Sequence, residues 1–299
     1  MSGLPSAEAM QEPPLRPFRV VLDPGHGGTD EGTVFQTQTS RIAEKTVTLQ
    51  LARKVAHQLR ARGYAVTLTR NDDHEIALGT RTQIANRIGA EIFISIHMNS
   101  SQAAHRKDVE GIETYILNNT TDASSKRLAR LENNELPDNS SSAPSSKGPS
   151  SNGPPPTSRS PEDRDVALIL KDLRLDGNLS SSKRLACNIQ EHLVSATSNR
   201  TNLLRRNRGI KQALFHVLLG ADMPSVLVEA GFLNSAHDRS FALSLRGQAI
   251  YSRAIADAVD QYAVNQYSDR LDFISLNKGT TRPFQHSTHP IKLGRCKVN

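Results

Sequence analysis

The stretch RVVLDPGHGGTDEG, Arg19–Gly32, leads an apolar strand pattern directly into a turn that holds a proline, several glycines and His26. A short apolar run bounded by turn residues is typical of a buried strand. The glycines let the backbone turn sharply and approach a ligand closely. By itself the turn is a weak signal, because its histidine could simply face solvent. Its meaning depends on what else the fold brings to the end of this strand.

Strand and helix patterns alternate after this turn. Residues 40–63 predict a helix, with Ser40 as candidate N-cap, apolar residues at helical spacing and Gly63 as its stop. Further strands are expected at 64–70, 91–97 and 111–117 and within 223–235, and further helices at 81–89, 121–135, 163–173, 178–198 and 244–265. This order predicts an α/β fold, in which a mostly parallel, twisted sheet is flanked by helices.

The composition along the chain predicts a single catalytic domain at 18–265. The Pro-rich residues 1–17 are expected to be a flexible leader, and 266–299, with little periodicity, a loose C-terminal extension. A helical and disordered segment is inserted at about 121–176. Its middle, 137–163, has almost no apolar residues, so it cannot bury enough surface to offset its ordering entropy and is predicted to be disordered.

The formal net charge of +7 over 299 residues favours an anionic partner such as a cell-wall polymer, a membrane surface or a nucleic acid. We interpret the basic cluster at 200–211 as a solvated patch, and the scarcity of aromatic residues argues against nucleic acid. No apolar run reaches the roughly 20 residues of a transmembrane helix, and no signal-peptide pattern is visible. Two cysteines are too few for a disulfide framework or a cysteine zinc site. Any metal must be held by histidines and carboxylates.

Four groups fall where such a site would form. His26 follows the first strand, His97 and Glu229 each end a strand, and Glu44 lies in the first turn of the helix after His26. Sites in open α/β sheets form at the carboxyl ends of the strands. Two imidazoles and a carboxylate suit Zn²⁺, and a further carboxylate could serve as general base. Asp23 is a candidate acceptor for the free nitrogen of a ligating histidine. Taken singly, a histidine at a strand end is more often structural than a ligand, and Glu44 could be an ordinary first-turn glutamate. Glu229 is harder to dismiss, because a carboxylate that ends a buried strand needs a partner.

Four motifs occur in a specific order: DPGHGG (23–28), EKTVTLQLA (44–52), SIHMNS (95–100) and MPSVLVEAGFLNS (223–235). With them the chain resembles the type-3, AmiA/AmiB/AmiC-like group of zinc-dependent N-acetylmuramoyl-L-alanine amidases, from about Arg19 to Val264. The resemblance implies His26, Glu44 and His97 as zinc ligands and Glu229 as the catalytic glutamate.

That family hydrolyses the amide between N-acetylmuramic acid and L-alanine in peptidoglycan. The resemblance therefore implies a hydrolase of cell-wall remodelling and daughter-cell separation, in the periplasm or cell envelope. Two alternatives remain at this point. One is a catalytically silent peptidoglycan-binding or regulatory homologue, and the other is a different metallopeptidase on the same scaffold.

The inserted segment also has a counterpart in the division-associated members of this family. There an inserted helix covers the zinc site with an acidic side chain until an activator protein displaces it. The resemblance implies Glu132 or Glu135 as such an autoinhibitory plug. The alternative is that both are ordinary solvated residues of a helix.

Overall fold

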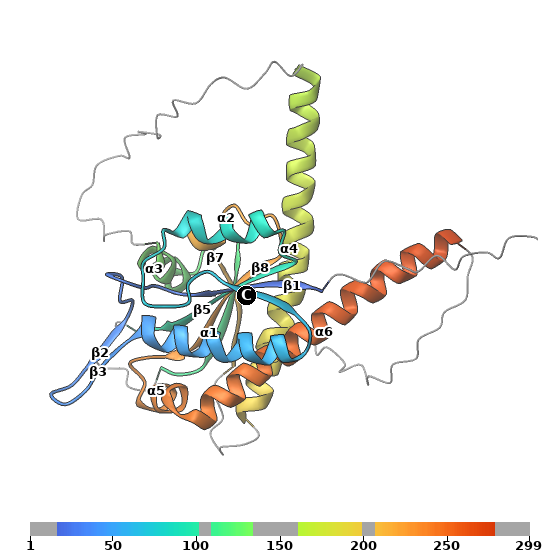
Figure 1. Cartoon of the computed structure of the whole chain (residues 1–299). Helices are drawn as coiled ribbons and strands as arrows, with labels where there is room; N and C mark the ends of the chain where they lie inside the picture. Colours follow the sequence, from blue (N-terminus) through green and yellow to red (C-terminus); the bar gives the residue numbers. More distant parts are fainter. Residues whose placement is uncertain (1–16, 102–108, 134–160, 199–206, 279–299) are drawn as a thin grey trace, which may run out of the picture.

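The computed structural model describes residues 17–101, 109–133, 161–198 and 207–278. At its centre lies a six-stranded sheet with the strand order β4-β1-β5-β8-β6-β7 (Figure 1). The four strands β4, β1, β5 and β8 are parallel, whereas β6 is antiparallel to β8 and parallel to β7. The predicted α/β fold with a mostly parallel sheet is therefore confirmed. The strands are β1 Arg19–Pro24, β4 Ala65–Leu68, β5 Ile92–Asn99, β6 Ile112–Leu117, β7 Asn207–Ala213 and β8 Ser225–Phe232.

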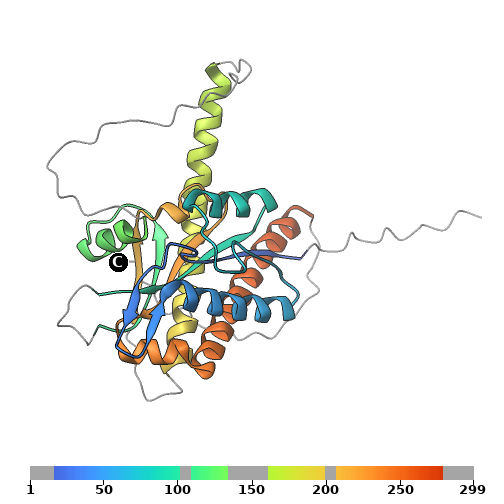
Figure 2. The ribbon, with the colours of Figure 1, turned by 60° about the vertical axis from the view of Figure 1, so that its left-hand side comes forward.

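Helices cover both faces of the sheet (Figure 2). Strand β5 is buried along its whole length, and its side chains alternate between the faces. Ile94 and Ile96 join the core under α1 (Glu44–Ala61), α4 (Pro161–Ser198) and α6 (Leu245–Lys278), whereas Phe93 joins the core under α2 (Leu78–Ile88) and α3 (Ala123–Glu132). The short helices η1 (His216–Leu218) and α5 (Ala236–Leu243) complete the two layers. Which face a strand residue occupies thus decides which helices can reach it.

The first helix begins later than its sequence pattern predicts. We expected it to start after Ser40, but α1 begins at Glu44 and its N-cap is Ala43, whose side chain makes no capping hydrogen bond. The reason is a short hairpin, in which β2 (Val34–Gln36) pairs antiparallel with β3 (Arg41–Ala43). The second strand of the hairpin ends at Ala43, so the helix begins at Glu44.

Two helices are longer than predicted. The expected pair at 163–173 and 178–198 is one helix, α4, which begins at Pro161 and so takes up the last residues of the tract predicted to be disordered. Helix α6 continues to Lys278, so the first part of the extension expected at 266–299 is helical, and 279–299 lie outside the described residues. Both helices run on past the body of the domain (Figure 1). The predicted leader, apart from residue 17, and Glu135 lie outside the described residues, as does most of the predicted disordered tract. Within the described residues, no helix is apolar over enough length to cross a membrane.

Candidate metal centre

Three strand ends converge on one edge of the sheet. Pro24 of β1 pairs with Ile96 of β5, and His97 of β5 pairs with Glu229 of β8. Because Ile96 and Val228 point into the core under α1 and α4, the adjacent His97 and Glu229 point to the opposite face, toward α2 and α3. These side chains therefore lie at the edge of the sheet expected from topology, and the strand register adds which face they share.

His26 lies in the turn after β1, with its ring folded inward. Its φ of 61° is the one positive φ of a non-glycine residue in the described part of the chain, and its side chain is buried. Such a backbone conformation is costly for an L-residue unless its surroundings enforce it. A Cβ on Gly25 would lie 2.4 Å from Cε1 of His97, and one on Gly32 would lie 2.5 Å from Cδ2 of His26. These two glycines make room for the imidazoles.

Two buried arginines hold this turn by its carbonyl oxygens. Arg81 donates from Nη1 to Pro24 O and from Nη2 to His26 O, both at 3.0 Å. Arg70 donates from Nε to Pro24 O at 3.0 Å and from Nη2 to Gly25 O at 2.7 Å. Every carbonyl from Pro24 to His26 therefore accepts from a guanidinium, which fixes the direction of the His26 side chain.

Four donor atoms meet at a single point. Glu44 Oε1 lies 3.1 Å from His26 Nε2 and 3.2 Å from His97 Nδ1, and Glu132 Oε2 lies 3.3 Å and 3.0 Å from the same two nitrogens. Ligands bound tetrahedrally at zinc–ligand lengths are separated by about 3.3–3.6 Å. The cluster of His26, Glu44, His97 and Glu132 thus has the donor types and close to the spacing of a tetrahedral metal site.

The hydrogen bonding around these atoms also fits a cation. Buried His26 Nε2, His97 Nδ1 and Glu132 Oε2 have no hydrogen-bond partner among the described residues, although buried polar atoms are nearly always satisfied. The surrounding atoms, by contrast, are engaged: His26 Nδ1 lies 3.0 Å from both carboxylate oxygens of Asp30, and Thr33 N donates to the outward-facing Oε2 of Glu44. The inward-facing Oε1 of Glu44 accepts one hydrogen bond, from Met98 N at 2.8 Å. Three of the four inward-facing atoms therefore lack a hydrogen-bond partner among the described residues, so these residues could hold a metal ion.

The electrostatics of the cluster favour positive charge at its centre. Burial lowers the pKa of His97, but the carboxylates of Glu132 and Glu44 outweigh burial and raise this pKa to about 10. Burial likewise opposes ionisation of Glu44, yet the neighbouring His26 and His97 hold the pKa of its carboxyl well below the usual range. Two buried carboxylates beside two imidazoles need a compensating cation, whether protons on the rings or a metal ion.

Glu229 lies beside this cluster and is differently placed. It is fully buried, and neither carboxylate oxygen has a hydrogen-bond partner among the described residues. Burial raises the pKa of Glu229 well above its usual value; nearby Glu132 and Glu44 raise it further, and His97 opposes them. A desolvated carboxyl next to a cation site is suited to taking up and releasing a proton.

The structure corrects the expected role of Asp23. Its carboxylate does not contact a histidine: it accepts from Thr69 Oγ1 at 2.6 Å, Ser95 Oγ at 2.7 Å and Arg81 Nη1 at 2.9 Å. Asp30 occupies the place beside His26 Nδ1 instead. Asp23 points into the sheet from β1, whereas the His26 ring is turned away by its backbone. Asp23 therefore acts on the turn only through Arg81.

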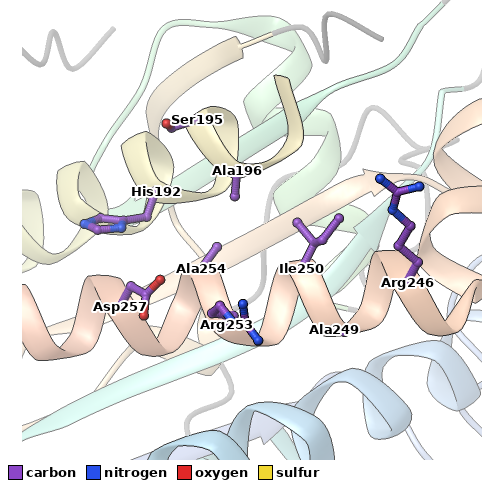
Figure 3. A pocket seen from close by; sticks show the side chains of 9 residues that line it. All are labelled: His192, Ser195, Ala196, Arg246, Ala249, Ile250, Arg253, Ala254 and Asp257. Atoms are coloured by element: carbon purple, nitrogen blue, oxygen red, sulfur yellow. The ribbon is translucent and has the colours of Figure 1, made fainter. Parts of the chain in front are cut away.

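A separate pocket of about 520 Å³ lies between α4 and α6 (Figure 3). His192 lines it from α4, and Arg253 and Asp257 line it from α6. These two helices cover the face of the sheet opposite to His97 and Glu229. The pocket is thus distinct from the metal centre and gives no route to it.

Fold and site together define an α/β protein with a buried histidine–glutamate centre suited to a metal ion. The family model described as N-acetylmuramoyl-L-alanine amidase matches residues 20–158 and 166–261. The chain belongs to this N-acetylmuramoyl-L-alanine amidase family, and the resemblance drawn from its motifs is confirmed.

Individual relatives agree with the family match. The chain is 31% identical over 272 residues to the amidase AmiC of Neisseria meningitidis, covering 88% of this chain and 58% of that protein. It is 28% identical over 252 residues to AmiA of Escherichia coli, covering 83% of this chain and 75% of that protein. An amidase structure from Clostridium difficile 630 aligns with a TM-score of 0.57 and 26% identity over 83% of this chain and 97% of that one. The AmiC2 structure of Nostoc punctiforme aligns with a TM-score of 0.56 and 26% identity, over 82% of this chain and 97% of that one.

Proposed function

We propose that this protein is a zinc-dependent amidase that hydrolyses the bond between N-acetylmuramic acid and L-alanine in peptidoglycan, and that it acts in the cell envelope during wall remodelling and cell separation. The observation that carries the proposal is the convergence of His26 Nε2, Glu44 Oε1 and His97 Nδ1 beside the buried carboxyl of Glu229. A donor set of two imidazoles and one carboxylate suits Zn²⁺. The family membership supplies the substrate class.

In this proposal His26, Glu44 and His97 hold the ion, and Asp30 orients the His26 ring through Nδ1. When bound, zinc supplies Lewis-acid polarisation of the amide carbonyl and of water. Glu229 accepts a proton from the attacking water and returns it to the nitrogen of the leaving L-alanine. Its burial favours the first step, because a carboxyl without hydrogen-bond donors has a raised pKa and takes up a proton more readily.

The test is mass spectrometry of peptidoglycan sacculi digested with the full-length chain loaded with zinc. We expect release of peptides with a free N-terminal L-alanine, and loss of at least about 10³-fold in rate for Glu229→Gln. Glu191→Gln, on α4, is the matched control and should cleave normally. Cleavage within the peptide would identify a different metallopeptidase. Binding of sacculi without cleavage, unchanged by Glu229→Gln, would identify a silent homologue.

We further propose that α3 keeps the centre closed and that Glu132 is the plug. Glu132 is the last residue of α3, and its Oε2 takes the fourth position around the histidine nitrogens. That position is where water and substrate must bind in a catalytic zinc site. Displacement of α3 by an activator protein would then expose the ion and admit the substrate.

Glu132→Ala should raise the basal rate of sacculus digestion by about 10- to 100-fold, because it removes one charged contact to the centre. Glu135→Ala is the comparison, since the sequence alone did not separate the two glutamates, and it should leave the rate unchanged. Zinc content is measured for both variants. A Glu132→Ala chain that binds zinc and digests no faster than wild type would contradict the plug.

A further inference from the structure

A row of charged side chains extends from the metal centre across the sheet. Glu229 of β8 pairs with His97 on one side and with Glu113 of β6 on the other. Because residues paired across strands point to the same face, Glu113 lies beside Glu229 on the face of the metal centre. Strands β6 and β7 run opposite to β8, so their first residues lie at the edge where β5 and β8 end. Arg208, near the start of β7, therefore belongs to this same edge.

Glu113 is a buried carboxylate with four donors. Asn99 Nδ2 and Tyr115 Oη donate to Oε2 at 2.9 and 2.6 Å, while Lys211 Nζ at 2.8 Å and Arg208 Nε donate to Oε1. The cationic partners Lys211 and Arg208 hold the pKa of Glu113 below its usual value despite burial. Two cations thus share one carboxylate, and the cluster of Glu113, Arg208 and Lys211 carries one positive charge in excess.

The Arg208 guanidinium is held so that one edge of it stays open. Its Nε donates to Glu113, and its Cζ lies 5.1 Å from the centre of the Phe232 ring. Neither Nη atom has an acceptor among the described residues, and the side chain is 25% exposed. A guanidinium fixed through Nε presents its two Nη groups as a fork, which matches a carboxylate with two parallel hydrogen bonds.

We infer that Arg208 binds a carboxylate of the peptide that the reaction releases; the inference rests on the proposed function. The only acid group of N-acetylmuramic acid is consumed in the scissile amide, so a carboxylate near the site must come from the peptide. Neighbouring strands lie about 4.8 Å apart, and the Arg208 side chain reaches back to Glu113, one strand from Glu229. An extended peptide spans about 3.3–3.6 Å per residue. The bound carboxylate therefore lies one or two residues beyond the cleaved bond.

The test compares two soluble substrates, N-acetylmuramoyl-L-alanyl-D-glutamate with free carboxylates and the same compound with both carboxylates amidated. Full-length zinc-loaded protein is assayed both with Glu132 intact and with Glu132→Ala. We expect the free acid to be preferred in kcat/KM by about 10- to 100-fold. Arg208→Met should abolish this preference through KM with little change in kcat, and Arg208→Lys should restore part of it.

Lys211→Met is the matched control. It removes the same charge from the same carboxylate, but Lys211 lies deeper in β7 and lacks the planar fork. It should lower the melting temperature and keep the preference within about twofold. A folded Arg208→Met chain that still prefers the free acid, or an equal loss in Lys211→Met, would overturn the assignment while cleavage itself upholds the proposed function. If no chain cleaves either compound or sacculi, the proposed function fails and this inference falls with it.

Discussion

The turn that carries His26 and the helix that carries Glu132 bring ligand atoms to the same point, but the protein holds them in different ways. Arg70 and Arg81 hold the turn from inside the core. They are 1% and 2% exposed, and they donate hydrogen bonds to backbone carbonyls of the turn. Helix α3 buries only Ser125, Leu128 and Ala129. The turn is part of the core, whereas the helix rests on it.

In the middle of α3, Arg127 Nη2 donates to Ser100 O at 3.1 Å and ties the helix to the end of β5. Asp122 caps the N-terminus of α3 by accepting from Ser125 N at 2.7 Å. At the other end Asn133 donates from Nδ2 to Leu214 O at 2.9 Å and accepts from His216 N at 2.7 Å. We call this pair of hydrogen bonds the Asn133 latch. The histidine ligands are built into the core, whereas α3 is tied to the domain through Arg127 and the Asn133 latch, so Glu132 can leave without disturbing His26 or His97.

The largest effect is expected from Arg81→Met, which removes the support of the turn. The change leaves the buried Asp23 without its cation, and breaking a buried pair costs about 3–5 kcal/mol of unfolding free energy. Urea denaturation monitored by circular dichroism measures it. Arg184→Met is the control, because Arg184 is exposed and, among the described residues, donates to serine hydroxyls and to no carboxylate. A loss below about 1 kcal/mol would show that the turn does not depend on Arg81.

The pH dependence of this variant follows from Asp23. Burial opposes its ionisation, but Arg81 and the Thr69 and Ser95 hydroxyls hold the pKa of Asp23 below its usual value. A depressed pKa in the folded state stabilises the wild type above pH of about 4, and this stabilisation is lost as the pH falls below that value. Without Arg81, burial alone would raise this pKa. The difference in stability between wild type and Arg81→Met should therefore shrink between pH 7 and pH 4.

The sequence predicted the part of the site that belongs to the core much better than the part that lies on helix α3. Apolar strands ending in His97 and Glu229 identify the edge of the sheet without any coordinates, because strand polarity alone brings such ends together. The sequence pointed to Asp23 as the partner of His26 and missed Asp30. That choice depends on the positive φ of His26, which turns its ring away from β1.

Two further differences between the predicted and the observed elements depend on the surroundings of a segment in the fold. Strand β7, which carries Arg208, reads NRGIKQA and has no run of apolar residues, so only its pairing with β6 reveals it as a strand. Helix α4 was divided in the prediction at Gly177, a residue that normally weakens a helix. A Cβ at Gly177 would meet nothing within 4 Å, so no neighbouring group requires a break there. Local patterns do not contain this kind of information.

A smaller effect is expected from Asn133→Ala, which releases the Asn133 latch and leaves every group of the metal centre in place. Both hydrogen bonds are solvent-exposed and so lie near the low end of the range for hydrogen bonds, together about 1–1.4 kcal/mol; their loss would shift α3 toward the displaced state and raise basal amidase activity by about 5- to 10-fold. Asn119→Ala is the control, since within the part of the chain that the structure describes Asn119 is hydrogen-bonded through its backbone N and not through its side chain. If Glu132→Ala raises the rate and Asn133→Ala does not, the core contacts of α3 suffice to hold it.

The smallest effect is expected at the other end of α3, from Asp122→Ala. Loss of an N-cap destabilises a helix by about 1 kcal/mol, so amides of the first turn of α3 should exchange hydrogen about fivefold faster. Asp122→Asn, which can still accept from Ser125 N, should retain most of the protection. The two ends differ in what they hold, because Asp122 stabilises the helix itself, whereas the Asn133 latch joins the helix to the loop at Leu214.

The pH dependence separates the cap from the latch. Hydrogen bonds from Ser124 and Ser125 lower the pKa of Asp122 to about 2. Its contribution is therefore complete above pH of about 4 and is lost only as the pH falls toward 2, while the neutral Asn133 latch does not titrate. Protection of the first turn should be constant from pH 7 to pH 5 in wild type and lower by the same factor throughout in Asp122→Ala. A factor that changes within this range would mean that a group other than Asp122 controls how α3 opens.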